Sequence, residues 1–137
     1  MRTFFDSSAF AKRYVEEPGS EAVDSLCQEA REVALSVLCV PEIISALNRR
    51  VRDGLLTRRE YAEAKQYLSQ DIQDAVIINL IPQVVSTCTK ILEDSPVRSA
   101  DALHVACALE WKTELFVSSD KGQISAAKKA GLHTRLV

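Results

Sequence analysis

Glycine and proline are scarce in this chain, with four residues of each among 137. So little turn-forming material leaves no room for a long linker, and we expect one domain that spans residues 1–137. Apolar residues make up 47% of the chain, which is enough for a core without disulfides. No apolar run is long enough to cross a bilayer, and Asp6 follows the N-terminus too closely for a signal peptide. We therefore expect a cytoplasmic protein without a membrane segment.

Clustered cysteines and histidines of the kind that bind zinc are also missing. The cysteines form no Cys-x-x-Cys pair and stand in apolar or helical contexts, which is typical of small buried hydrophobes. The two histidines, His104 and His133, are far apart in sequence, so their spacing disfavours a zinc site. A basic excess is missing as well, because the formal net charge is −2. The protein alone should therefore bind nucleic acid weakly and in a salt-sensitive way.

The apolar periodicity alternates between strands and helices. The predicted strands are 3–5, 33–38, 115–118 and 133–136, with 76–80 as either a short edge strand or a loop. The first predicted helices are 9–15, one capped by Ser20, one from Pro41 to Gly54, and one opened by a capping box at Thr57 and Glu60. The later ones are a helix from Pro82 with Val85, Thr89 and Leu92 facing inward, 100–111 capped by Ser99, and 123–130. This order predicts an α/β fold in three layers, with helices on both faces of a central, mostly parallel sheet.

Four acidic residues stand where the predicted helices begin. Asp6 and Asp120 come after apolar strands, and Glu42 and Asp101 lie in first helical turns. Connectivity brings Asp6, Glu42 and Asp120 to the carboxyl edge of the sheet, and Asp101 joins them if its apolar helix packs centrally. Carboxylates without cysteine or histidine are the ligands that Mg²⁺ prefers, with Mn²⁺ as the alternative. The pattern thus indicates a divalent-metal site, and from there chemistry on phosphate.

A simpler interpretation exists for each acid taken singly. Asp and Glu are common in first helical turns because they suit the helix dipole, so any one of them could be only a cap. The neighbouring serines Ser7, Ser8, Ser118 and Ser119 could hydrogen-bond to carboxylates, to metal-bound water or to phosphate. Spacing alone leaves the metal site and the set of caps about equally supported.

The ordered set of motifs resembles the PIN-domain nucleases, and in particular the VapC-type toxins of toxin–antitoxin pairs. The resemblance covers nearly the whole chain, and its most specific stretch runs from Arg98 to Ala106. The other stretches are Phe5–Lys12, Glu17–Ser20, Pro41–Leu47, Phe116–Lys121 and the helix end at Ala130-Gly131-Leu132. The acids fall at the family's acidic positions, and none of the four is missing.

The resemblance implies a PIN-like fold and a metal-dependent endoribonuclease that uses metal-activated water to leave 3′-hydroxyl and 5′-phosphate ends. It implies catalytic and Mg²⁺-binding roles, or Mn²⁺-binding roles, for Asp6, Glu42, Asp101 and Asp120. It also implies that the Ser8 hydroxyl supports the site. The partners it implies are an RNA substrate, a cognate antitoxin protein and a second copy of the chain.

Three other functions compete with the nuclease. One is a catalytically silent PIN-fold module that binds RNA or forms complexes. Another is a haloacid-type phosphatase, but it needs a second aspartate where Ser8 stands. The third is a nucleotide-binding enzyme, which is disfavoured because no glycine-rich loop follows any predicted strand.

Several charged and aromatic residues near these motifs also carry expectations. We expect solvated charges at Lys12 and Arg13. For Arg98 and Lys121, a solvated charge and a contact with phosphate or antitoxin are about equally supported. We expect His104 to be a packed, hydrogen-bonded histidine and not a catalytic base.

Overall fold

The computed structural model describes residues 1–137 and has a central sheet of five strands in the order β3-β2-β1-β4-β5. All four strand pairs are parallel, which confirms the α/β prediction and makes the sheet wholly parallel. The segment 76–80, for which strand and loop were both open, contains the edge strand β3. The strands are β1 Arg2–Phe5, β2 Glu32–Ser36, β3 Val76–Ile78, β4 Leu115–Ser118 and β5 Thr134–Leu136.

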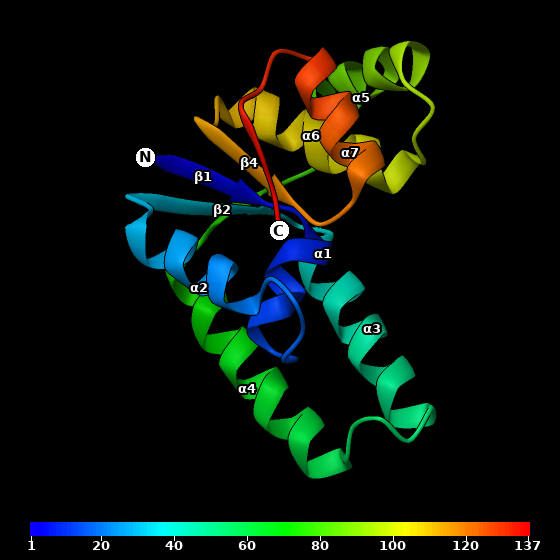
Figure 1. Ribbon diagram of the computed structural model, residues 1–137. Coiled ribbons are helices and arrows are strands. Elements are labelled where there is room, and N and C mark those ends of the chain that lie inside the picture. The colour runs from blue at the N-terminus through cyan, green and yellow to red at the C-terminus, as the bar shows by residue number, and fades with distance from the viewer.

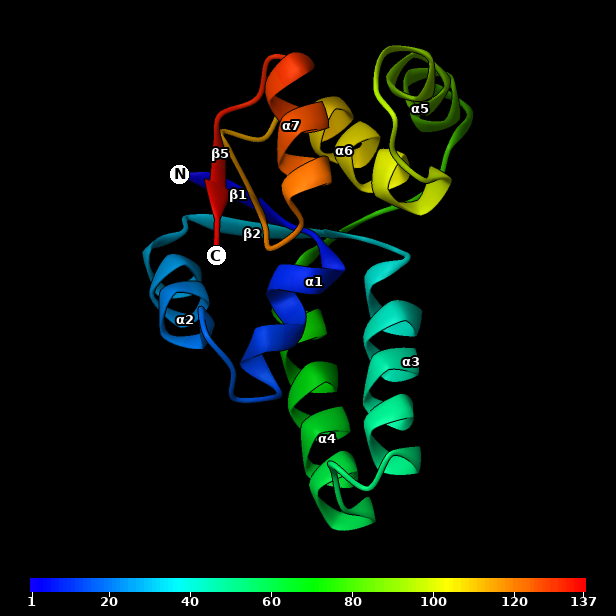
Figure 2. The ribbon, with the colours of Figure 1, turned by 45° about the vertical axis from the view of Figure 1, so that its right-hand side comes forward.

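Helices cover both faces of the sheet, as the three-layer prediction requires (Figure 1). Helices α5, α6 and α7 lie on one face, and α1, α2, α3 and α4 lie on the other, where α3 and α4 project from the sheet as a long hairpin (Figure 2). The helices are α1 Ser7–Phe10, the 3-10 turn η1 Ala11–Arg13, α2 Ser20–Glu29, α3 Cys39–Arg52, α4 Arg58–Asp74, α5 Pro82–Asp94, α6 Ser99–Trp111 and α7 Lys121–Lys129. Each of these helices is too short or too polar to cross a lipid bilayer.

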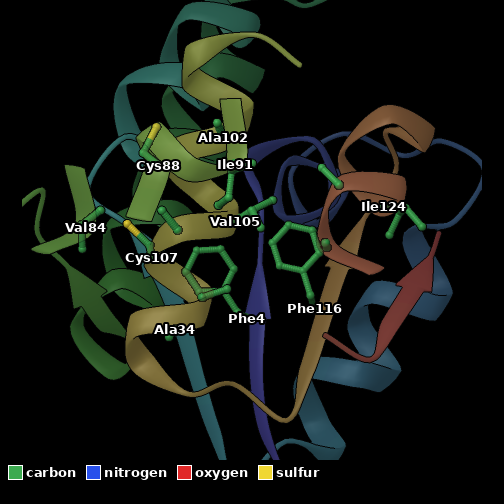
Figure 3. Close-up of a cluster of buried hydrophobic side chains, with 14 residues drawn as sticks. Phe4, Ala34, Val84, Cys88, Ile91, Ala102, Val105, Cys107, Phe116 and Ile124 are labelled. Carbon is green, nitrogen blue, oxygen red and sulfur yellow. The ribbon is translucent and has the colours of Figure 1, made fainter. Parts of the chain in front are cut away.

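Successive residues of the central strands supply two separate cores. Phe4 belongs to the core under α5, α6 and α7, while Phe5 belongs to the core under α1 to α4. The neighbouring strand β4 repeats the alternation, since Phe116 shares the first core and Val117 the second. Figure 3 shows Phe4 and Phe116 side by side in the first core, where their rings stack with centroids 5.7 Å apart. The two-residue period of a strand therefore holds both helical layers on one sheet.

Several helices begin earlier than the sequence indicates, and α1, α3 and α7 each begin two residues before the predicted position. Helix α1 begins at Ser7 because the carboxylate of Asp6 accepts a hydrogen bond from the backbone N–H of Ala9 and caps it. Helix α3 begins at Cys39, so Pro41 lies inside its first turn instead of opening it. Proline is tolerated there because its missing N–H would have had no helical partner.

Two predicted serine caps are wrong. Gly19 precedes α2 in a left-handed conformation with φ of 100°, and an added Cβ there would lie 2.9 Å from the backbone carbon of Val137. The hydroxyl of Ser20 instead accepts a hydrogen bond from the N–H of Glu17, which shapes the preceding turn. Ser99 is the first residue of α6 and does not cap it. The capping box at the start of α4 is present as predicted.

The buried face of α5 also differs from the prediction. The sequence indicates Val85, Thr89 and Leu92 as the inner stripe, but all three are exposed. The structure buries Val84, Cys88 and Ile91 against α6 instead, as the contact between these helices requires. Both stripes are apolar at helical spacing, so periodicity cannot say which one faces the sheet.

Candidate functional site

The candidate site lies at the carboxyl edge of the sheet, beside the pair β1 and β4. The chain moves from β1 to β2 and β3 on one side and later returns to β4 and β5 on the other, so its direction switches between β1 and β4. Ligands of parallel α/β sheets bind at such switch points. Asp6 directly follows β1, and Asp120 lies two residues after the end of β4.

Asp6 is fully buried and surrounded by donors. Its carboxylate accepts a hydrogen bond from the N–H of Ala9 at 2.9 Å and one from the Ser118 hydroxyl at 2.7 Å. The Ser8 hydroxyl lies 2.9 and 2.7 Å from the two carboxylate oxygens. Burial raises the pKa of Asp6 above its usual range, and these donors offset only part of that rise.

Glu42, in the first turn of α3, is tied to α1 and to α6. Its Oε1 atom accepts a hydrogen bond from the Ser7 hydroxyl at 2.7 Å and lies 2.5 Å from Nε2 of His104. Burial works to raise the pKa of Glu42, but the hydrogen bonds from His104 and Ser7 outweigh it, so the pKa is lowered. The glutamate is therefore held in its charged form.

Gln123 joins the remaining two acids. Its backbone N–H donates to Oδ1 of Asp120 at 3.1 Å, which makes Asp120 the cap of α7. Its side-chain amide donates to Oδ1 of Asp101 at 3.1 Å. The pKa of Asp101 is raised, first by burial and second by the negative charge of Asp120. Gln123 thus links two carboxylates that repel each other.

Hydrogen bonds and charge interactions link the four acids to one another. The Ser118 hydroxyl, which donates to Asp6, also accepts the backbone N–H of Asp120 at 2.9 Å. Asp120 connects through Gln123 to Asp101, as described above. Glu42 is bonded to His104 on the same helix as Asp101, and the charge of Glu42 is among the causes that raise the Asp101 pKa. Residues from four different segments of the chain therefore converge at this edge.

The donor chemistry of this edge suits a hard divalent cation, but the acids are not closed around one point. Nowhere do three or more His, Cys, Asp or Glu side chains group closely enough to hold a metal ion. The available ligands are nevertheless carboxylate oxygens, and the repulsion between Asp101 and Asp120 is what a cation would relieve. Oε2 of Glu42 and Oδ2 of Asp120 have no protein partner. The four carboxylates fit a cation in type, and side-chain rotation would have to complete the ligand set.

Most of the flanking polar residues act on the acids. Ser7, Ser8 and Ser118 all hydrogen-bond to carboxylates, whereas Ser119 contributes its backbone N–H, which donates to the Ser8 oxygen at 3.1 Å. Gln123 is a site residue that the sequence did not predict. Its place three residues after the capping Asp120 is the spacing of a capping box and was the one available signal.

The structure places four of the basic or titratable side chains that the sequence singled out. His104 is buried and hydrogen-bonded, as predicted. Arg98 is exposed and pairs with Asp101 across 3.7 Å, with 89% of its side chain accessible to solvent. The solvated charge predicted for Lys12 is wrong, because its Nζ is buried and donates to the backbone oxygen of Pro18 at 2.6 Å. Arg13 is also less exposed than predicted, since it pairs with Asp71 at 3.3 Å.

The fold has counterparts among known proteins. The sequence profile of the PIN-domain family matches residues 3–129. A comparison with curated protein sequences finds no significant match.

Several solved structures share the fold at low sequence identity. FitAcB from Neisseria gonorrhoeae is 17% identical, with a TM-score of 0.70 over 96% of this chain and 95% of that one. VapBC2 from Rickettsia felis, solved bound to a DNA fragment from its promoter, is 10% identical, with a TM-score of 0.71 over 100% and 99% of the two chains. VapC20 from Mycobacterium tuberculosis, described as a Sarcin-Ricin loop cleaving toxin, is 16% identical, with a TM-score of 0.70 over 95% of each chain.

Proposed function

The chain belongs to the PIN-domain family, and on that premise we propose that it is a divalent-metal-dependent endoribonuclease, the toxin of a toxin–antitoxin pair. The observation that carries the proposal is the hydrogen-bond network that gathers Asp6, Glu42, Asp101 and Asp120 at the switch point of the sheet. A set of independent helix caps would not need shared partners such as Ser118 and Gln123.

In this proposal the four acids hold Mg²⁺ or Mn²⁺. When bound, the cation lowers the pKa of water and neutralises charge on the phosphodiester. The chain's own contribution is to hold the carboxylates, with Ser8 and Ser118 orienting Asp6 in its buried place. No side chain of the site acts as general base, because the one histidine there has its Nε2 bonded to Glu42.

The proposed substrate is RNA. Arg98 is exposed beside Asp101 and offers a guanidinium to a phosphate near the acids. The formal net charge of −2 gives the rest of the surface little attraction for RNA, so binding by the protein alone should be weak and sensitive to salt.

The proposed partners are a cognate antitoxin protein and a second copy of the chain. Support for the antitoxin comes from similar structures solved as toxin–antitoxin complexes, including one from Klebsiella pneumoniae with a TM-score of 0.68.

Incubating the purified protein with RNA in Mg²⁺ or Mn²⁺ tests this function. We expect cleavage that EDTA stops and that is lost in Asp6→Asn and in Asp101→Asn. The matched control is Ser86→Ala on the exposed face of α5, which should cleave like the wild type. Cleavage that persists in both acid variants would refute the proposal that these acids form the catalytic site. RNA binding without cleavage by the wild type would favour the silent PIN-fold module instead.

A further inference from the structure

His104 presents an unusual arrangement for a histidine on a buried apolar helix. Its side chain is 2% exposed, and its ring lies edge-on to Phe4 with centroids 6.4 Å apart. Only Nε2 has partners, namely Oε1 of Glu42 at 2.5 Å and the Ser7 oxygen at 3.2 Å. Nδ1 is buried without any hydrogen-bond partner.

The unpartnered Nδ1 determines which of the two ring nitrogens carries the proton. A buried N–H without an acceptor costs more than a bare nitrogen without a donor, because the donor loses its bond to water. The proton therefore belongs on Nε2, which donates it to Glu42. A serine–histidine–acid relay is excluded, since that arrangement needs the acid on one ring nitrogen and the serine on the other. Here both Ser7 and Glu42 stand at the same nitrogen.

Two donors consequently converge on one oxygen of Glu42. The Ser7 hydroxyl and the His104 ring both bond to Oε1, while Oε2 has no protein partner. The Glu42 side chain is 39% exposed, so water would solvate it without this help. An aliphatic side chain at position 104 would therefore stabilise α6 as well as the buried imidazole does. The stability of the helix alone does not explain the histidine.

We propose that His104 and Ser7 are positioning residues that fix Glu42 through Oε1 and reserve Oε2 for a divalent cation. The inference rests on the proposed function, because it assumes that Glu42 is a ligand. Groups that orient a metal-binding carboxylate by hydrogen bonds commonly change metal affinity about 10–100-fold when removed. The histidine is thus a partner of the ligand and does not itself bind the metal.

Titration with MnCl₂ by calorimetry, together with the Mn²⁺ dependence of RNA cleavage, tests the proposal. His104→Leu keeps an apolar side chain in the core but removes the donor, whereas His104→Gln retains an amide N–H for Glu42. Ser7→Ala removes the second hydrogen-bond donor to Oε1 of Glu42. Val105→Ala, on the same helix and buried in the same core, is the control for lost packing alone.

We expect His104→Leu to weaken Mn²⁺ binding about tenfold or more and to raise the Mn²⁺ concentration for half-maximal cleavage in parallel. His104→Gln should recover most of the affinity, and Val105→Ala should lower the melting temperature in EDTA without changing affinity. Wild-type Mn²⁺ affinity in folded His104→Leu would overturn the inference. Should that variant not fold, wild-type affinity in Ser7→Ala would overturn it. A wild-type protein that neither binds Mn²⁺ nor cleaves RNA would instead refute the proposed function itself.

Discussion

Ser118 donates a hydrogen bond to Asp6 across 2.7 Å, although 112 residues separate them in the chain. The contact joins the ends of the adjacent parallel strands β1 and β4. Because the same hydroxyl accepts the backbone N–H of Asp120, one serine holds two of the four acids in place.

Replacing Ser118 by alanine should therefore damage both stability and function. The buried Asp6 would lose a donor and the N–H of Asp120 its acceptor, which should lower the free energy of unfolding by about 1–3 kcal/mol. Urea denaturation measures the loss, and cleavage of RNA in Mn²⁺ should fall in parallel. Ser86→Ala is the matched control at an exposed serine. A Ser118→Ala protein as stable as that control would contradict the role given to this hydroxyl.

The stacked pair Phe4 and Phe116 should dominate the core under α5, α6 and α7. Both rings are fully buried on registered neighbouring strands. Phe4→Ala should lower the free energy of unfolding by about 3–5 kcal/mol, because it removes buried area and leaves a cavity. Denaturant unfolding followed by tryptophan fluorescence checks this, since Trp111 packs against the same core. A loss below about 1 kcal/mol would mean that the core collapses around the missing ring.

Asp120 should control the ionisation of Asp101. The charge of Asp120 is the second cause, after burial, of the raised Asp101 pKa. Asp120→Asn keeps an oxygen to cap α7 but removes the charge, so the Asp101 pKa should move down toward its ordinary 3.8. Carbon-detected NMR titration of the side-chain carboxyls measures the change.

The raised pKa of Asp101 also fixes how the stability of the fold should change with pH. Asp101 favours folding while it is protonated, and that contribution is lost as the pH rises from 3.8 through the raised pKa. In Asp120→Asn this pH-dependent loss should become smaller. An unchanged Asp101 pKa would show that the two carboxylates do not sense each other.

Cys39 and Cys107 should be inert in the folded protein. Burial raises the pKa of Cys39 to about 12 and that of Cys107 to about 11, against an ordinary value of 9.0. Because the folded values are raised, these thiols stabilise the fold below pH 9, and that contribution is lost as the pH rises toward 11 and 12. Iodoacetamide at pH 9 should therefore leave both unmodified in the native protein and alkylate both in concentrated urea. Mass spectrometry identifies the modified peptides, and rapid native labelling of Cys39 would contradict its burial.

The sequence predicted the convergence of the acids because strand order and connectivity alone bring strand ends to one edge. Asp6 and Asp120 need only the strands before them, and these are plain in the apolar pattern. The partners of the acids were harder to predict, since Gln123 on α7 donates a hydrogen bond to Asp101 on α6. Contacts of that kind depend on how helices pack, which local periodicity does not contain.

The wrong predictions for α5 and Lys12 also come from tertiary contacts that the local sequence pattern does not contain. On α5 two apolar stripes compete, and only packing against α6 selects Val84 over Val85. Lys12 looks like a surface charge, yet the backbone oxygens of Pro18 and Val137 meet its ammonium group. These outcomes depend on tertiary neighbours, so no reading of the local pattern could have supplied them.

The central claim is that four carboxylates from separate segments act as one cation site. Titrating Mn²⁺ into the wild type and into Asp6→Asn, Glu42→Gln, Asp101→Asn and Asp120→Asn, with binding followed by electron paramagnetic resonance, tests it most directly. The claim predicts saturable binding by the wild type and a marked loss of affinity in every one of the four folded variants. Wild-type affinity retained in all four would contradict it.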